Sequence, residues 1–551
     1  MLADAGAAPS PGSLSRAVST AAPRRRVPWM LQSPVIADVH PPQWLERLPR
    51  WASTGGVLIV LLAASAFVRT RYLSGQLWSE EAIATGIATH PLGQIFGILR
   101  HAGAAPLYFL ILHVWISLFG SSEAATHGLS LLFGLATVPI AMWAGWSLFG
   151  RRAGMIAAAL FAFSAFLTQF ATEAQVFELL ALLGLIGAAV FLHGFAFRRR
   201  THVVGFGLVL VLLLYTSPWG FFFWVGAAVA LIPVVRTSFD GRAVLRDAGL
   251  AFAGAAALFL PWLPTLVYQL GHDTSPWTYF EFTGPTFPAS LLGGDRVLAT
   301  FAVVAAAAFL PLLLRERRRS PEAVSVWALL AIIVAAMLFA GAAAVFAESW
   351  VTRYFAPLVG AMLLLSALAC ARTGVLGLAA VLISIAFVAN AASFSPKYKS
   401  NLRDLTGELA PLMRPGDTVL VGEPEQVPLA WYYLPAGLRF ATLTGRLTDP
   451  STMNWSDAYT RLAEATPAAT ENALVASLGP GRRLLYARPL TEGAEGWAPS
   501  WSGLVRRRAA QWGQLLASDP RLRLLPGARA PRYYRGSCCV ADSALVYTRV
   551  G

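Results

Sequence analysis

The hydrophobic residues of this chain are gathered into long runs that short polar segments separate. Many runs are about 17–25 residues long, the length that an α-helix needs to cross the core of a bilayer. Two of them, Val324–Phe346 and Gly374–Ala392, contain no charged residue. A helix that is apolar on every face is typical of a membrane span, because a surface helix of a soluble protein has a polar face. The pattern therefore predicts an α-helical protein that crosses the membrane many times.

About eleven of the runs are expected to be membrane spans. They comprise residues 53–70, 124–148, 153–171, 175–197, 202–215, 218–235, 247–268, 297–314, 323–347, 354–371 and 373–393. A further apolar run, residues 104–120, contains Pro106, His113 and Trp115. We interpret it as an interfacial or re-entrant helix, because a full span at this place would reverse the orientation of every later helix.

The composition supports a membrane protein and argues against a nucleic-acid partner. Hydrophobic residues make up 56% of the chain and charged residues only 13%, whereas soluble domains are nearer a quarter charged. The formal net charge of +14 would suit nucleic-acid binding in a soluble protein, but the sequence contains no basic–aromatic module for that purpose. The arginines lie at the ends of the apolar runs, where they favour contacts with membrane lipids and determine topology.

The basic residues predict the orientation of the spans. They form five clusters beyond residue 150, and a pair of expected spans separates each cluster from the next. The clusters are Arg151–Arg152, Arg198–Arg200, the group of Arg236, Arg242 and Arg246, Arg315–Arg319, and Arg372. Because basic residues favour cytoplasmic loops, we expect all five clusters in the cytoplasm and the other helix ends outside the cell membrane.

This orientation divides the chain into three expected regions. Residues 1–52 form a disordered cytoplasmic tail and an interfacial segment, and residues 53–393 form the transmembrane domain, whose first external loop covers about 71–123. Residues 394–551 lie outside the membrane and are long enough to form a domain. This last region alternates a helix-like segment with strand-like ones, which predicts an extracytoplasmic α/β domain. The segments are residues 401–413, 418–422, 483–487 and 544–550.

Three carboxylates are expected near the outer membrane face. Glu80 and Glu81 follow the first span, and Glu173 follows the third. Acidic residues beside a bilayer are costly unless they are paired, hydrated or functional. A partly desolvated carboxylate with a raised pKa could take the proton of an attacking hydroxyl as a general base. Alternatively, Glu80 and Glu81 are solvated residues that start a helix, and Glu173 caps the helix after it.

Polar residues on the same side add candidates for ligand binding. His101 lies in the first external loop, and Arg353 and Tyr354 start the tenth expected span at its outer end. An arginine just above the apolar layer is suited to a lipid phosphate, because its guanidinium offers a fork of donors. The alternatives are a structural histidine and an interfacial anchor, with Tyr354 in the aromatic belt of the membrane.

Several segments taken together resemble bacterial glycosyltransferase family 39. These proteins have the GT-C fold and are related to protein O-mannosyltransferases and to the aminoarabinose transferase of lipid A. The resemblance is clearest in the first part of the chain and returns near the tenth span and after the last one. The segments are residues 77–92, 105–154, 163–179, 352–365 and 395–421.

The resemblance implies a transferase that moves a sugar from a polyprenyl-phosphate donor to a glycan, lipid or protein of the cell envelope, with inversion. Glu80 and Glu81 stand where the family has an Asp-Glu pair whose first acid is the base, so Glu80 would be the base, or Glu81 if the register differs by one. The other site residues implied would orient substrates or hold the lipid phosphate. These are His101, Tyr108 and Glu173, and Arg353, Tyr354, Lys397 and Lys399. Lys397 and Lys399 could instead be surface lysines.

The sequence also departs from the pattern of the family. Ala102 replaces an acid before Gly103, His127 replaces an arginine, and Gln175 replaces an arginine two residues after Glu173. Either this protein uses a different donor or acceptor, or it keeps the fold as an inactive lipid- or glycan-binding scaffold; a lipid or polysaccharide transporter is a weaker alternative. The first loop contains no Asp-x-Asp, and a divalent metal is possible but not required by the sequence.

Overall fold

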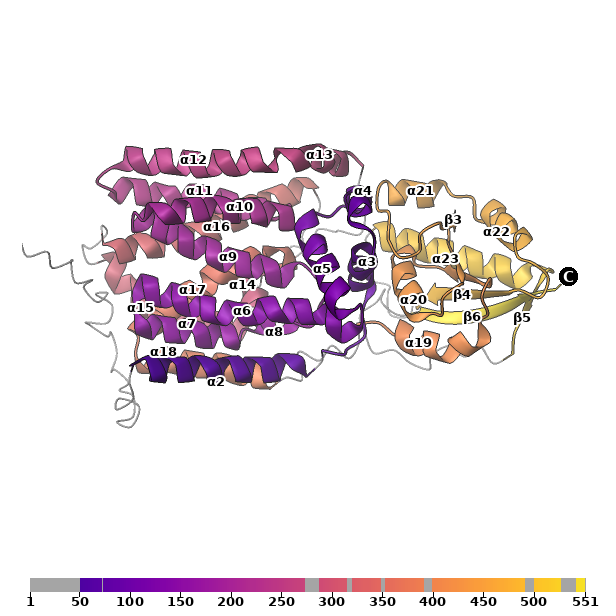
Figure 1. The fold of residues 1–551 in the computed structure, drawn as a ribbon, viewed down its shortest axis with the longest axis horizontal. Helices are drawn as coiled ribbons and strands as arrows, with labels where there is room; N and C mark the ends of the chain where they lie inside the picture. The colour runs from indigo at the N-terminus through magenta and orange to yellow at the C-terminus, as the bar shows by residue number, and fades with distance from the viewer. Residues whose placement is uncertain are drawn as a thin grey trace, which may run out of the picture.

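The computed structural model describes residues 50–71, 73–272, 287–314, 320–347, 352–390, 399–490, 500–526 and 542–550. It contains a bundle of long helices and a smaller α/β domain at one end of the bundle (Figure 1). Three short helices lie between the two parts and fill the first loop of the chain. They are α3 (Ser79–Ala88), α4 (Leu92–Ala102) and α5 (Pro106–Phe119).

The helices of the bundle follow one another up and down along its long axis (Figure 1). They are α2 (Arg50–Thr70), α6 (Glu123–Phe149), α7 (Arg151–Ala162), α8 (Ala165–Phe170), α9 (Phe177–Phe191), η2 (Leu192–Ala196), α10 (Arg200–Thr216), α11 (Gly220–Thr237), α12 (Gly241–Phe259), η3 (Leu260–Trp262), α13 (Leu263–Gly271), α14 (Phe287–Leu292), α15 (Asp295–Leu314), α16 (Pro321–Ala347), η5 (Thr352–Phe355), α17 (Ala356–Arg372) and α18 (Val375–Ala389).

Seven stretches of the described helices are long and apolar enough to cross a membrane, which confirms a multi-pass membrane protein. They are residues 53–70, 123–149, 177–196, 220–237, 241–271, 321–343 and 352–372, and each overlaps an expected span. The total of eleven spans stays a prediction.

One expected span, residues 153–171, is not a continuous helix. It is interrupted at Phe163, because the Ser164 hydroxyl accepts a hydrogen bond from the backbone of Leu167 and starts α8 as a new helix. The run at residues 104–120 forms α5, which lies in the layer between the bundle and the α/β domain (Figure 1). This position agrees with the interfacial interpretation.

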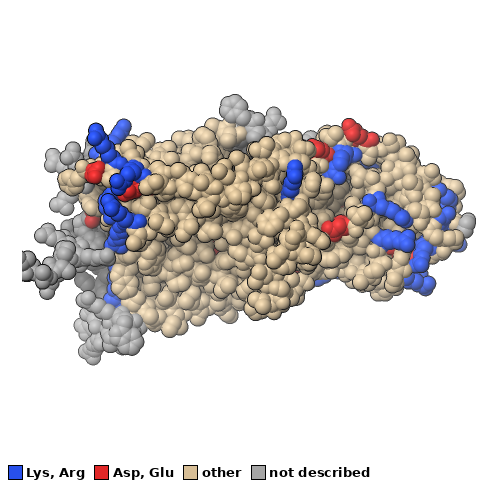
Figure 2. Space-filling model, turned by 45° about the horizontal axis from the view of Figure 1, so that its top comes forward, with Lys and Arg blue, Asp and Glu red and all other residues tan. Residues whose placement is uncertain are grey.

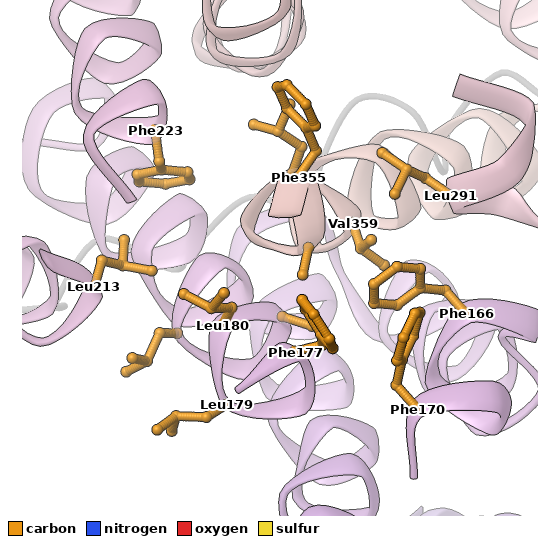
Figure 3. Packing of buried hydrophobic residues seen from close by; sticks show 14 of the residues in the cluster. Phe166, Phe170, Phe177, Leu179, Leu180, Leu213, Phe223, Leu291, Phe355 and Val359 are labelled. Atoms are coloured by element: carbon orange, nitrogen blue, oxygen red, sulfur yellow. The ribbon is translucent and has the colours of Figure 1, made fainter. Parts of the chain in front are cut away.

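Helices α9 and α17 form the centre of the bundle. Glycines let their backbones approach closely, as small residues do between membrane helices. A β-carbon on Gly184 would lie 2.0 Å from the carbonyl oxygen of Pro357, and one on Gly360 would lie 2.4 Å from the Cα of Leu185. Around this contact, Phe177 and other aromatic side chains of α8, α9 and η5 pack into a continuous core (Figure 3).

Basic side chains gather at the end of the bundle that is farthest from the α/β domain (Figure 2). The side of the bundle between this end and the α/β domain carries few charges on the visible face. This end contains the starts of α7, α10 and α12, where Arg151, Arg200 and Arg242 lie, and the end of α11 with Arg236. The clusters that the structure describes therefore share one end, as the positive-inside interpretation requires. The expected cluster at residues 315–319 lies outside the described residues.

The C-terminal α/β domain contains a mixed sheet with the strand order β3-β2-β1-β4-β6-β5. Strand β1 pairs in parallel with β2 and β4, while β3, β5 and β6 are antiparallel to their neighbours. The expected helix and the three expected strands are present as α19, β1, β4 and β6. The elements are α19 (Leu402–Leu409), η7 (Ala410–Leu412), β1 (Thr418–Val421), η8 (Pro424–Gln426), α20 (Val427–Tyr433), β2 (Arg439–Thr442), β3 (Gly445–Arg446), α21 (Ala458–Glu464), α22 (Pro467–Ala476), β4 (Arg483–Pro489), α23 (Ser500–Ser518), β5 (Leu522–Leu524) and β6 (Asp542–Arg549).

The α/β domain holds helix α3 in place. The carbonyl oxygen of Ser451 packs so closely on Gly86 that a β-carbon there would lie 1.8 Å from it. The hydroxyl of Tyr433 accepts a hydrogen bond of 2.8 Å from the backbone N–H of Leu77, just before α3. The position of the acidic residues on α3 therefore depends on both parts of the molecule.

Candidate functional site

The two adjacent glutamates of α3 lie in its first turn but have different surroundings. Successive residues of an α-helix are about 100° apart around its axis, so the two side chains leave the helix in different directions. The Glu81 side chain is 0% exposed, whereas the Glu80 side chain is 24% exposed. One carboxylate therefore faces the protein interior and the other is partly exposed.

Four groups donate hydrogen bonds to the buried Glu81 carboxylate. One oxygen accepts from the His127 Nε2 and from the backbone N–H of Ala174, both at 2.8 Å. The other accepts from the backbone N–H of Trp78 at 3.1 Å, which caps α3. The Lys399 ammonium donates to both oxygens, at 3.2 and 3.1 Å. Glu81 thus joins α3, α6, the turn before α9 and the segment that leads into the α/β domain.

His127 contacts an oxygen atom on each side of its ring. Its Nδ1 lies 2.6 Å from the carbonyl oxygen of Leu73, and its Nε2 lies 2.8 Å from the Oε1 of Glu81. The ring thus links Glu81 of α3 to the backbone of the segment before it. This position, which the family resemblance marks as a missing arginine, holds a group that can carry the positive charge.

These donors keep Glu81 ionised. Burial opposes the charged form, but Lys399, His127 and the N–H of Ala174 together lower the pKa of Glu81 to about 2. A carboxylate with such a low pKa is a weak base, and its oxygens already accept hydrogen bonds from the protein. It is therefore poorly suited to take a proton from a substrate. Its position favours a structural role in the site.

The more exposed Glu80 pairs with Arg353 of η5. The Arg353 Nη2 donates to the Glu80 Oε1 at 2.5 Å, and the Arg353 side chain is 23% exposed. The guanidinium lies 5.2 Å from the ring centre of Trp78, 5.6 Å from that of Phe177 and 5.9 Å from that of Tyr354. Burial raises the pKa of Glu80, although the Arg353 charge acts in the opposite direction. Glu80 can therefore both bind a cation and take up a proton.

Glu173 lies in the turn between α8 and α9, beside the same charges. The residue is 9% exposed, and its Oε2 has no hydrogen-bond partner among the described residues. Burial raises the pKa of Glu173 to about 7, and the nearby carboxylates of Glu81 and Glu80 contribute in the same direction. The turn also provides the N–H of Ala174 for Glu81 and the carbonyl of Thr172 for Lys399, at 2.5 Å.

A row of aromatic rings leads from this charged cluster to the outer surface of the bundle. Phe177 lies 5.7 Å from Tyr354, and Tyr354 stacks on Trp219 at 5.1 Å. The row continues to Phe222 at 5.3 Å and from there to Phe339 at 6.1 Å. Phe339 is 46% exposed and lies on the membrane-spanning helix α16. An apolar path thus connects the Glu80–Arg353 pair with the surface that faces lipid.

The structure places His101 in a separate cluster. Its Nδ1 lies 3.1 Å from the Tyr268 hydroxyl and 3.2 Å from the Ser456 hydroxyl. Burial and the charge of Arg100 lower the pKa of His101. These contacts join α4, α13 and the α/β domain, and none of them involves the carboxylates of α3.

The remaining sequence candidates have mixed positions. Tyr108 on α5 is 0% exposed, and its hydroxyl has no hydrogen-bond partner in the described chain. Lys399 contacts Glu81, whereas Lys397 lies outside the described residues. The sequence reasoning did not identify His127 and Trp78 as partners of the acids, because their spacing along the chain gave no sign of the contact. Only the departure from the family pattern at His127 drew attention to that position.

The carboxylates are matched by cations from this chain and are not arranged as a metal centre. Among the described residues, no group of three or more His, Cys, Asp and Glu side chains could hold a metal ion. The Arg353 guanidinium and the Lys399 ammonium already contact Glu80 and Glu81, and such positive neighbours repel a divalent ion. The described residues around these carboxylates therefore do not support a metal, and the divalent metal stays a prediction.

A second buried pair of charges lies deeper in the bundle. Arg69 of α2 is 1% exposed and donates from its Nη2 to the carbonyl of Phe161 at 2.8 Å. Glu178 of α9 is fully buried. A β-carbon on Gly134 would lie 2.8 Å from both the Arg69 Nη1 and the Glu178 Oε2, so this glycine of α6 provides the space between them. Sequence reasoning missed this pair.

Comparisons with known proteins establish the fold. No protein-family model and no curated protein matches the sequence. Apo ArnT from Cupriavidus metallidurans is similar with a TM-score of 0.58 and 14% identity, over 90% of this chain and 98% of that one. ArnT bound to undecaprenyl phosphate has a TM-score of 0.55 and 14% identity, over 90% and 97%. AglB from Archaeoglobus fulgidus, an oligosaccharyltransferase in complex with an inhibitory peptide and a dolichol-phosphate, has a TM-score of 0.54 and 11% identity, over 85% and 72%.

ArnT, a lipid A aminoarabinose transferase, and AglB both belong to the GT-C superfamily. The likeness covers nearly the whole length of ArnT and includes both the helical bundle and the C-terminal domain. The expectation of a GT-C fold is confirmed: the chain is a multi-pass membrane protein with the GT-C fold.

Proposed function

We propose that this protein is an inverting glycosyltransferase that uses a polyprenyl-phosphate-linked sugar as donor. The observation that carries the proposal is the Glu80–Arg353 pair, which joins a partly exposed carboxylate to a cation at the end of an aromatic path toward lipid. A base and an anion-binding group are the two parts that such a transfer needs. The GT-C fold is consistent with this chemistry but does not by itself assign it.

Glu80 is the proposed base. It would take the proton of the acceptor hydroxyl while the oxygen attacks the anomeric carbon of the donor sugar, and the bond from that carbon to the phosphate oxygen breaks. Glu81 is the less suitable candidate, because its oxygens accept from Trp78, His127, Ala174 and Lys399. In this proposal Glu81 fixes the position of α3, and the neighbouring Glu80 carries out the proton transfer.

Arg353 is the proposed ligand of the donor phosphate. Its guanidinium can stabilise the negative charge that develops on the leaving phosphate. The aromatic row from Tyr354 through Trp219 and Phe222 to Phe339 would hold the first part of the prenyl chain. The ArnT structure with undecaprenyl phosphate and the AglB structure with dolichol-phosphate support a donor of this class.

The acceptor is proposed to be a glycan, lipid or protein of the cell envelope. This choice depends on the predicted orientation, which places α3 and the α/β domain outside the cell membrane, opposite the basic end of the bundle. Glu173 and Tyr108 remain candidates for orienting the substrates. His101 would act only through the α/β domain, because its contacts are with Tyr268 and Ser456.

The proposal is tested by measuring sugar transfer with purified full-length protein in lipid nanodiscs. Undecaprenyl-phosphate sugars serve as donors and envelope extracts as acceptors. Glu80→Gln should lower transfer by roughly a hundredfold or more, the usual loss on removal of a general base. Glu123→Gln is the matched control, because Glu123 also pairs with an arginine, Arg403 at 2.9 Å, outside the site. Transfer that is unchanged in Glu80→Gln would refute the assignment of the base, and binding without any transfer would favour an inactive scaffold.

A further inference from the structure

Arg353 is bound to a carboxylate of its own protein at the place where the proposed function requires a phosphate. The Arg353 Nη2 donates a charge-assisted hydrogen bond to the Glu80 Oε1. A guanidinium offers a limited fork of donors on one edge. A phosphate that arrives on this edge would therefore meet the Glu80 oxygen already in its place.

The surroundings indicate which partner of the pair can move. Arg353 is held among the rings of Trp78, Phe177 and Tyr354. The two side chains are almost equally exposed, 24% for Glu80 and 23% for Arg353, but the hydrogen bond of Glu80 among the described residues is the one to Arg353. A change of side-chain torsion would turn the Glu80 carboxylate away from Arg353 without disturbing α3, because Glu81 keeps the helix anchored.

We propose that Glu80 occupies the phosphate site on Arg353 until the donor displaces it, so that donor binding releases the base. This inference rests on the proposed function, since it takes the polyprenyl phosphate group as the displacing anion. In the absence of donor the base is neutralised by Arg353. With donor bound, the phosphate takes the guanidinium, and Glu80 is free to face the acceptor hydroxyl. The donor therefore binds before the acceptor is activated.

The same exchange accounts for product release. During transfer the acceptor proton moves to Glu80, the acceptor oxygen forms the new glycosidic bond, and polyprenyl phosphate leaves with the electron pair of the broken bond. The protonated Glu80 is neutral and cannot compete for Arg353. Once Glu80 loses this proton to solvent, its carboxylate again binds Arg353 and displaces the product. The product phosphate carries a charge of about −1.5 to −2 near pH 7, so it would otherwise be held firmly.

The exchange makes an unusual prediction for the variant that lacks the base. Glu80→Gln keeps the size of the side chain but removes the charge that competes for Arg353, so undecaprenyl phosphate should bind roughly tenfold more tightly than to the wild type. A base that did not compete with the ligand would leave the affinity unchanged. Two control variants separate competition from the general effect of removing a negative charge.

The first control is Glu173→Gln, which lies in the same cluster and influences Arg353 only through its charge. The measurement is made at pH 8, where Glu173, with a pKa of about 7, is ionised. The second control is Glu123→Gln, which removes a carboxylate with 16% exposure that pairs with Arg403 instead. Neither control should tighten binding by more than roughly twofold, because neither carboxylate hydrogen-bonds to Arg353 in the described structure.

The experiment measures the dissociation constant of undecaprenyl phosphate for the full-length protein in nanodiscs, with thermal unfolding as a check that each variant is folded. Tighter binding in Glu80→Gln alone supports the exchange. Equal tightening in Glu80→Gln and Glu173→Gln, or no tightening in either, overturns it. A folded wild type that binds no undecaprenyl phosphate overturns both the donor class and the exchange. Tighter binding in Glu80→Gln alone, together with no transfer by the wild type to any acceptor, supports the exchange and counts against the proposed catalysis.

Discussion

Replacing Lys399 by methionine would leave the buried Glu81 carboxylate without its ammonium partner. The ammonium lies 3.1 and 3.2 Å from the carboxylate oxygens, and the two side chains are 10% and 0% exposed. Removing one member of a buried ion pair costs about 3–5 kcal/mol. Although burial opposes the charged form, the donors lower the pKa of Glu81 from 4.5 to about 2, a difference that corresponds to about 3 kcal/mol. Because His127 and two backbone N–H groups still bind the carboxylate, we expect a loss of about 3 kcal/mol.

The assay is thermal unfolding of the full-length protein in nanodiscs. Lys399→Met should lower the apparent Tm by about 5 °C or more. The double variant with Glu81→Gln should recover part of this loss, because it also removes the charge that was left unpaired. A Lys399→Met variant within about 1 kcal/mol of the wild type would refute the central role of this pair. A double variant less stable than Lys399→Met would refute the reasoning about the buried charge.

Three further predictions concern packing and pH. Gly86→Ala should weaken the packing of the α/β domain on α3, because its β-carbon would lie 1.8 Å from the Ser451 carbonyl oxygen. The measurement is limited proteolysis, in which the junction should be cut faster. Gly97→Ala is the control and should not change the rate, because nothing lies within 4 Å of its β-carbon. Gly134→Ala should lower stability by about 1–3 kcal/mol in thermal unfolding, because its β-carbon would lie 2.8 Å from a buried guanidinium and a buried carboxylate. Glu173, whose burial raises its pKa from 4.5 to about 7, stabilises the protein fully below pH 4.5 and loses this contribution as pH rises through 7. The Tm of Glu173→Gln should therefore change less between pH 4.5 and 7 than the Tm of the wild type. The same pH dependence of Tm in both proteins would contradict the raised pKa of Glu173.

The positions of seven spans could be read from the sequence, because the length and apolar character of a membrane helix are local properties of the chain. Three of the six described strands, β1, β4 and β6, were also foreseen, since short apolar segments such as Thr418–Val421 follow a turn at Arg414–Asp417. The interruption at Phe163 was not foreseen. It depends on a cap by Ser164, and one serine inside an apolar run is a weak signal without its geometry.

The candidate site could be predicted only in part, for a reason that α3 illustrates. The sequence shows two neighbouring acids, Glu80 and Glu81, but not which of them faces the interior. That depends on the rotation of α3, and the rotation is fixed by contacts with residues that are distant in the sequence, such as Lys399, which lies 318 positions from Glu81. The pairing of Arg353 with Glu80 spans 273 positions. Chemistry that depends on such distant contacts is visible only in the folded chain.

The residues that depart from the family pattern change the number of positive charges around the carboxylates of the site. Three carboxylates, Glu80, Glu81 and Glu173, face the cations of Arg353 and Lys399 and the ring of His127. His127 contacts Glu81 at 2.8 Å from the position where the family pattern has an arginine. A donor phosphate adds a further negative charge that the cluster cannot neutralise with its own cations. In the proposed exchange the carboxylate that responds is Glu80, which leaves Arg353 to the donor phosphate. Loss of two arginines from the pattern is therefore compatible with a phosphate-binding site, provided that Arg353 exchanges Glu80 for the donor phosphate.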